Sequence, residues 1–156
     1  MKLLCLLLFI FSSFNLQKDN YAIKIRDLTL TRSGKLLKHD EKIVDVLKKW
    51  GAPSRRFREM DEDMGFNMDV LQYGEDRLYF YDGELGAFSI QSSAIRVTHK
   101  LLQVGQAIPN GFVYEMEKGI FTAEFIDEQG YPMALIFDIR TDASKKIKQI
   151  AVYPTN

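Results

Sequence analysis

The sequence has little cysteine and no excess of charge of either sign. Its 156 residues contain one cysteine, which excludes a disulfide framework within the chain. Lysine plus arginine and aspartate plus glutamate both number 21, so the formal net charge is zero. This balance argues against a strongly basic surface for nucleic acid and against an acidic disordered tail. The composition is that of one ordinary globular domain.

Sequence patterns that hold nucleotides, metals or reactive serines are also lacking. Neither G-x-x-x-x-G-K-[ST] nor G-x-G-x-x-G occurs, and no serine stands in G-x-S-x-G. The two histidines, His39 and His99, do not form a zinc-binding pair, and Asp61, Glu62 and Asp63 match only a fragment of a calcium loop. We therefore expect no cofactor, no metal site, no catalytic residue and no nucleic-acid partner.

One hydrophobic run stands out, at the amino terminus. Lys2 precedes nine apolar residues, Leu3 to Phe11, and polar residues follow. This pattern is typical of a secretory signal peptide, which we place at residues 1–17, and it is shorter than the roughly 20 residues that span a bilayer. The mature chain, 18–156, would then be periplasmic or secreted, without Cys5 and without a membrane span. The alternative is a buried N-terminal strand or helix of a cytosolic protein.

The segment from Asp40 to Trp50 carries the strongest helix pattern. An apolar stripe falls at i, i+3, i+4 and i+7 (Ile43, Val46, Leu47, Trp50). Asp40 can cap the start of this helix, while Gly51 and then Pro53 can end it. A weaker helix is expected over 108–118, so that residues 23–97 and 98–156 would form two similar submodules.

Most of the remaining sequence alternates as strands do. Alternation predicts strands near 21–31, 69–73, 78–81, 84–91, 120–126, 131–140 and 146–153. A slip in the alternation at Arg26-Asp27 indicates a bulge or bend in the first of these strands. The charged segment 55–63 is typical of a solvated loop. Asp82-Gly83 is a strong hairpin signal. A bulge at Gly86-Ala87 would bring Phe88 to the face of Leu78; the alternative is a sheet buried on both faces. The expected fold class is α+β, with one or two short helices packed on a mainly antiparallel sheet. A tandem pair of such helix-plus-strands modules is the alternative arrangement.

The run Ile43 to Pro53, IVDVLKKWGAP, together with Val104-Gly105-Gln106, resembles a pattern of small exported bacterial proteins. These are the outer-membrane-assembly lipoproteins of the SmpA/OmlA type and proteins with the β-lactamase-inhibitor-protein-like fold. The resemblance implies helices on an antiparallel sheet and a role in binding other proteins, without catalysis. The chain lacks the lipid-attachment cysteine of the lipoproteins.

Aromatic residues supply the candidate site. Tyr73, Tyr79 and Tyr81 gather near one hairpin, and Arg55 and Arg56 could form the rim of the same surface. Tyrosine is favoured at protein interfaces, so these residues would bind a partner protein; the alternative is that they cover a second helix or loop. We expect an exported, non-enzymatic protein with an envelope or scaffold role. The alternatives are an inhibitor or immunity-type protein, or a hydrolase with an unrecognised site.

Overall fold

The structure is a computed structural model that describes residues 22–62, 65–97, 102–110, 112–115 and 119–154. The expected signal peptide, Cys5, Asp63 and His99 lie outside these residues.

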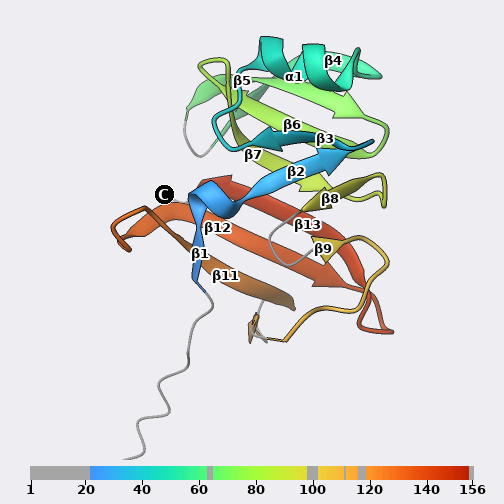
Figure 1. Ribbon diagram of the computed structural model, residues 1–156, viewed down its shortest axis with the longest axis vertical. Coiled ribbons are helices and arrows are strands. Elements are labelled where there is room, and N and C mark those ends of the chain that lie inside the picture. The colour runs from blue at the N-terminus through green and yellow to red at the C-terminus, as the bar shows by residue number, and fades with distance from the viewer. Residues whose placement is uncertain (1–21, 63–64, 98–101, 111, 116–118, 155–156) are drawn as a thin grey trace, which may run out of the picture.

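Most strands belong to one sheet of nine strands, called the large sheet (Figure 1). Its order is β1 (Ala22–Lys24), β11 (Ile120–Ile126), β12 (Pro132–Thr141), β13 (Ile147–Pro154), β7 (Glu84–Ile90), β6 (Asp76–Tyr81), β5 (Phe66–Tyr73) and β4 (Arg55–Asp61), with β10 (Val113–Glu115) also paired to β11. The β1–β11 pair is parallel and the other pairs are antiparallel. Strands from both halves of the chain therefore belong to a single sheet, with β11, β12 and β13 next to one another between β1 and β7.

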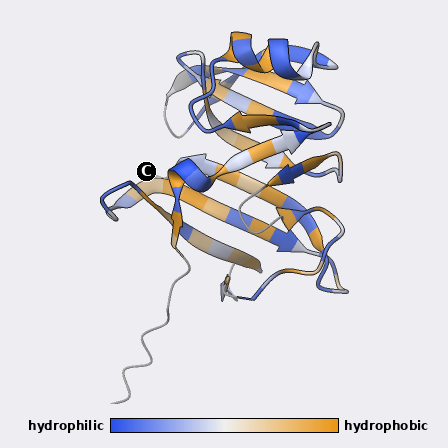
Figure 2. Ribbon diagram, viewed as in Figure 1, coloured by the Kyte–Doolittle hydropathy of each residue, from blue (hydrophilic) through white to orange (hydrophobic). Residues whose placement is uncertain are grey.

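A second, smaller sheet lies against one face of the large sheet. Its order is β3 (Lys35–Lys38), β2 (Thr29–Arg32), β8 (Ile95–Val97) and β9 (Leu102–Gln103). Hydrophobic and hydrophilic residues alternate along the strands (Figure 2), as expected for sheets with one face buried. The core between the layers joins both sheets and the helix in one cluster, including Leu30, Leu37, Val46, Leu78, Phe80 and Phe137. Among the described residues, no helix or second sheet covers the opposite face of the large sheet.

The expected α+β fold class is wrong, because strands dominate the described residues. They contain one α-helix, α1 (Ile43–Trp50), and one 3-10 turn, η1 (Ile25–Asp27). The helix expected over 108–118 is not there in the described part of that segment, where β10 pairs with β11 instead. Residues 111 and 116–118 are outside the description. A tandem pair of helix-plus-strands modules is therefore not the architecture.

Helix α1 has the predicted apolar stripe and C-terminus but a later start. Val46 and Trp50 are buried, and the Gly51 N–H donates to the Leu47 carbonyl at 2.9 Å with a left-handed φ of 80°. Asp40 does not cap the helix. Its backbone N–H instead donates to the Leu85 carbonyl at 2.9 Å, which holds the segment before the helix on β7.

The charged segment 55–63 is not a solvated loop over its described length. Residues Arg55 to Asp61 form β4, which pairs with β5 along seven residue pairs. Arg56 and Arg58 are exposed, whereas the alternating residues Phe57 and Glu59 are half-buried. One face of this edge strand is therefore in contact with solvent. Charged side chains on an edge strand also discourage pairing with other chains. The charged residues of this segment therefore lie on an edge strand of the large sheet and not in a loop.

Two predicted irregularities are present, and each changes the course of the chain. The slip in alternation at Arg26-Asp27 is the 3-10 turn η1, which takes the chain from β1 in the large sheet to β2 in the small sheet. The predicted bulge is confirmed: Tyr79 pairs with Ala87 and Phe80 with Leu85, so Gly86 has no opposite residue. Phe88 consequently lies opposite Leu78 in the core.

Candidate functional site

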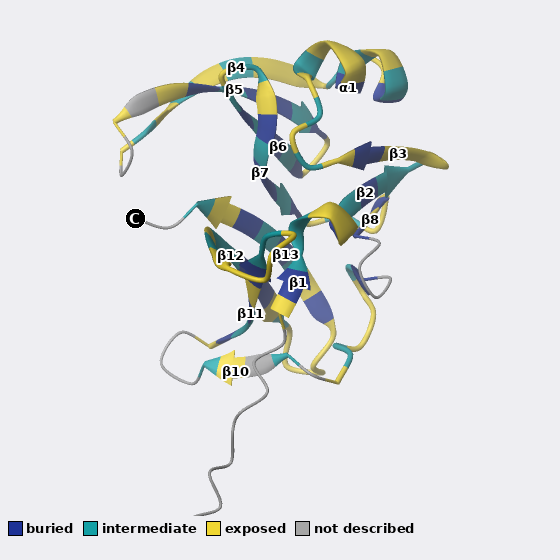
Figure 3. Cartoon of the chain, turned by 60° about the vertical axis from the view of Figure 1, so that its left-hand side comes forward, coloured by how far each residue is buried: buried dark blue, intermediate teal, exposed yellow. Residues whose placement is uncertain are grey.

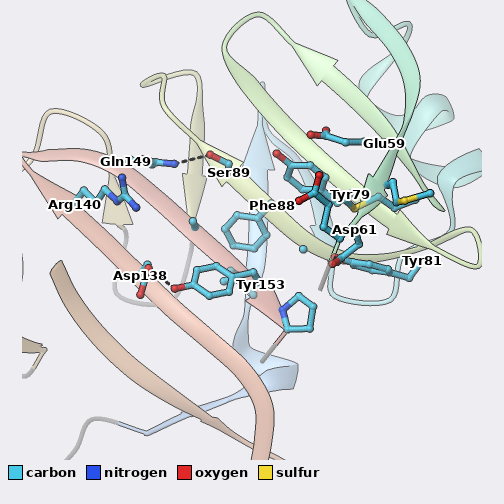
Figure 4. Close-up of a pocket in the computed structure, with 17 residues that line it drawn as sticks. Glu59, Asp61, Tyr79, Tyr81, Phe88, Ser89, Asp138, Arg140, Gln149 and Tyr153 are labelled. Atoms are coloured by element: carbon cyan, nitrogen blue, oxygen red, sulfur yellow. Dashed lines mark hydrogen bonds between the residues drawn. The ribbon is translucent and has the colours of Figure 1, made fainter. Parts of the chain in front are cut away.

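A pocket of about 700 Å³ opens on the face of the large sheet that the small sheet does not cover. Its walls come from β4, β5, β6 and β7 on one side and from β12 and β13 on the other (Figure 4). Between the two sides, β7 and β13 pair through only three residue pairs, the last being Phe88 with Val152. Beyond that pair the two parts of the large sheet separate (Figure 3). The pocket lies at this separation.

Two of the predicted binding residues, Tyr79 and Tyr81, line the first wall. Both are half-buried and alternate along β6 with the buried residues Leu78 and Phe80, so they point to the opposite face. The Tyr81 hydroxyl donates a hydrogen bond to Asp61 Oδ2 at 3.3 Å. Burial and the Asp61 carboxylate raise the pKa of Tyr81 to about 12. Tyr81 is therefore a neutral hydroxyl at physiological pH.

The second wall holds another tyrosine–aspartate pair. Tyr153 on β13 donates its hydroxyl to Asp138 Oδ2 on β12 at 2.5 Å. Burial, followed by the hydrogen bond to Asp138, raises the pKa of Tyr153 well above its ordinary value. Asp138 is only 5% exposed, and its other carboxylate oxygen, Oδ1, is buried without a hydrogen-bond partner in the part of the chain that the structure describes. A buried carboxylate oxygen left unpaired is costly and therefore calls for an explanation.

The pocket is acidic overall. Four carboxylates line it among the described residues (Glu59, Asp61, Glu62, Asp138), against one basic residue, Arg140. A second carboxylate oxygen, Glu59 Oε2, is also buried and has no hydrogen-bond partner within the described ranges. The remaining polar contact joins two lining residues, since Gln149 Nε2 donates to Ser89 Oγ at 2.9 Å. Formal charges of four minus and one plus give the lining a net charge of minus three.

The structure separates Tyr73 from the other two tyrosines. Tyr73 faces the core, where it is 6% exposed and packs edge-on against Trp50 at 5.6 Å between ring centroids. Its hydroxyl donates to the Gly51 carbonyl at 2.9 Å, and Arg32 lies 4.8 Å from its ring centroid. These contacts hold the end of α1 on the sheet. Tyr73 is not among the residues that line the pocket.

The two predicted rim arginines do not line the pocket either. Arg55 lies on the pocket face but further along β4, with its guanidinium 5.4 Å from the ring centroid of Phe57. Arg56 is opposite Leu71 in the β4–β5 pairing, so it occupies the other face, where it lies 3.5 Å from an oxygen of Asp69. The charged residues that line the pocket among those described are instead Glu59, Asp61, Glu62, Asp138 and Arg140.

Sequence reasoning missed the β12–β13 wall. A polar residue inside the hydrophobic run Leu135 to Ile139 was the available signal for Asp138. Its partner Tyr153 lies 15 residues further on, and only the β12–β13 pairing brings the two together. Glu59 was assigned to a loop, so its position on the pocket face could not be read from the sequence.

The chemistry available at the pocket is binding by carboxylates and tyrosines. Within the described ranges, no group of three histidine, cysteine, aspartate or glutamate side chains could hold a metal ion. His39 lies away from the pocket lining, with its Nδ1 atom 2.6 Å from Asp40 Oδ1. The part of the chain that the structure describes also has no helix long and apolar enough to cross a membrane.

Comparison with known proteins adds no relative. No protein-family model matches the chain, and no curated protein or solved structure is significantly similar to it.

Proposed function

We propose that this chain is an exported, non-enzymatic protein that binds another protein through the pocket face of its large sheet. The role would be that of an envelope or scaffold component. The resemblance to small exported bacterial proteins that bind other proteins points the same way.

The observation that carries this proposal is the uncovered, tyrosine-lined face of the large sheet. Tyr79, Tyr81 and Tyr153 all line the pocket, and Tyr153 is 38% exposed. Tyrosine offers a large contact area at a modest cost in side-chain entropy, which favours it at interfaces. Within the described ranges, the single helix α1 and the small sheet pack on the other face of the large sheet, which supports the binding interpretation of these tyrosines.

The enzyme alternative has less support. A hydrolase would need an activated nucleophile or an acid–base pair at the pocket. His39 is outside the pocket lining, and the serine that lines it, Ser89, accepts its hydrogen bond from Gln149, which is not a base. An inhibitor or immunity-type protein would use the same tyrosine face, and only the identity of the partner distinguishes it from a scaffold.

Site-specific photo-cross-linking in the organism that produces the protein tests the binding role. A photoreactive phenylalanine at Tyr79 should form a covalent adduct with a defined partner protein. The matched control places the same residue at Tyr131, which is 69% exposed and outside the pocket lining. Equal adducts from both positions, or none from position 79, would contradict the proposal. An enzyme as partner would identify an inhibitor.

Export is tested separately by mass. Expression of the full chain in a Gram-negative host should give a periplasmic product shortened by roughly 13 to 22 residues. A full-length cytosolic product would overturn the exported assignment while leaving the binding role open to the cross-linking test.

A further inference from the structure

We propose that the acidic pocket receives a cationic side chain of the partner protein, arginine in preference to lysine, and that Asp138 is its main carboxylate ligand, with Glu59 adding negative charge from the opposite wall. This inference rests on the proposed binding function and specifies the chemistry of the partner. Two observations support it: the buried carboxylate oxygens Asp138 Oδ1 and Glu59 Oε2, and the net negative charge of the described pocket lining.

Two carboxylate oxygens in the pocket lining are buried and have no hydrogen-bond partner among the described residues. Asp138 Oδ1 belongs to a side chain that is only 5% exposed. The other oxygen of Asp138 accepts the Tyr153 hydroxyl, so this carboxylate is held in one orientation. Glu59 Oε2 is the second such oxygen, on a half-buried side chain of β4. A donor that enters the pocket would satisfy groups that are otherwise costly to bury.

Arginine suits such a pair better than any other donor. Its guanidinium is planar, always charged, and presents five N–H groups in a fixed geometry, so it can donate two hydrogen bonds to one carboxylate. The aromatic faces add to this preference, since tyrosine rings attract cations above their faces. Tyr79 lies near Glu59 and Asp61 on one wall, and Tyr153 lies beside Asp138 on the other (Figure 4).

The two tyrosine hydroxyls hold the carboxylates without neutralising them. Tyr81 donates to Asp61 and Tyr153 donates to Asp138, so each bond orders a carboxylate and leaves its negative charge in place. Arg140 is the single opposing charge in the described lining. It lies two residues from Asp138 on the same face of β12 and is exposed, so it lies at the edge of the site.

Peptide selection on the intact protein tests the inference. A library of disulfide-closed random peptides is selected on the full chain, and binders are retained only if the Tyr79→Ser/Tyr81→Ser double variant fails to bind them. We expect an arginine at a fixed position in the consensus. Replacing it with citrulline, which keeps the shape but removes the charge, should weaken binding at least ~10-fold.

Two variants with opposite expected effects make the test sharper. Asp138→Asn keeps an acceptor for Tyr153 and should reduce the affinity for the arginine peptide at least ~10-fold. Arg140→Gln removes the opposing charge and should leave the affinity unchanged or increase it. Glu59→Gln serves as a second carboxylate variant should Asp138→Asn unfold, which urea titration would reveal.

The outcomes separate the inference from the proposed function. Pocket-dependent peptides without a cation, or equal binding of arginine and citrulline peptides, would overturn the inference and leave the binding function standing. An acidic consensus lost in Arg140→Gln would overturn it in favour of an anionic partner. If no peptide depends on Tyr79 and Tyr81, the proposed function itself fails.

Discussion

The ring of Tyr81 lies directly on the backbone of Gly86. A methyl group built at Gly86 would stand 2.5 Å from Cδ2 and 3.0 Å from Cε2 of that ring, well inside van der Waals contact. Gly86 is also the bulged residue of the β6–β7 hairpin. The bulge and the absence of a side chain at Gly86 together leave the space that the Tyr81 ring occupies. The first wall of the pocket therefore depends on this glycine.

Gly86→Ala should displace the Tyr81 ring and destabilise the fold by about 1–3 kcal/mol, the usual cost of overpacking. Urea unfolding measures this change. In the Tyr81→Ala background the same substitution should cost much less, because the clashing ring is gone. Equal costs in both backgrounds would show that the contact does not exclude a side chain at position 86.

The hydrogen bond between Tyr153 and Asp138 should stabilise the second wall. Tyr153→Phe leaves both oxygens of a nearly buried carboxylate without a partner, so unfolding free energy should fall by about 1–3 kcal/mol. Tyr131→Phe is the matched control, since Tyr131 is 69% exposed, and it should change stability by less than about 0.5 kcal/mol. Similar effects of the two substitutions would contradict the importance of the bond.

Both pocket tyrosines with raised pKa values should make stability fall in alkali. The folded pKa of Tyr81 is about 12, above the ordinary value of 10.0, and that of Tyr153 is raised further. Above pH 10 the unfolded chain therefore binds fewer protons than the folded chain, and the free energy of unfolding decreases as pH rises toward 12. Below pH 10 the stabilisation is fully present.

Urea unfolding between pH 8 and pH 12 measures this loss. The Tyr81→Phe/Tyr153→Phe variant should show a shallower decline, because its most perturbed phenols are absent. An equally steep decline in that variant would assign the effect to other groups.

Asp76 should be a structural carboxylate rather than a functional one. It is 1% exposed and accepts hydrogen bonds from the Gln91 N–H at 2.8 Å, the Ser92 N–H at 2.8 Å and the Ser92 hydroxyl at 2.5 Å. These bonds fix the chain between β7 and β8, where it passes from the large sheet to the small sheet.

Asp76→Ala should cost about 3 kcal/mol or more, because three donors lose a charged acceptor. Ser92→Ala should cost less, since the two backbone bonds to Asp76 remain. Glu124→Ala, at an exposed position of β11, is the control with little expected change. Peptide binding at the pocket should be unaffected in any Asp76 variant that remains folded.

Local signals in the sequence were enough for several elements. The stripe from Ile43 to Trp50 and the Gly51 end determined the helix, because helix periodicity and C-terminal capping are short-range effects. The Asp82-Gly83 turn and the bulge at Gly86 were also predictable, since one residue of slip is needed to keep Phe88 with Leu78 in the core. The same alternation placed Tyr79 and Tyr81 on the face opposite the core.

Other elements required tertiary context. The segment from Arg55 to Asp61 has the composition of a loop, and it becomes a strand because β5 offers seven pairing partners. A second helix was expected over 108–118, but pairing with β11 makes Val113–Glu115 a strand. The α+β expectation failed for this reason, since β propensity depends more on neighbouring strands than on the segment itself.

The sequence by itself indicated tyrosines for the candidate site and the face that Tyr79 and Tyr81 occupy, but it did not indicate the carboxylates of the pocket. Only the tertiary structure decided which of them meet. It moved Tyr73 into the core, put Arg56 on the other face, and brought Asp138 and Tyr153 to the pocket through the β12–β13 pairing. The physical reason is that side-chain alternation is local, whereas strand order depends on pairings between segments far apart in the chain.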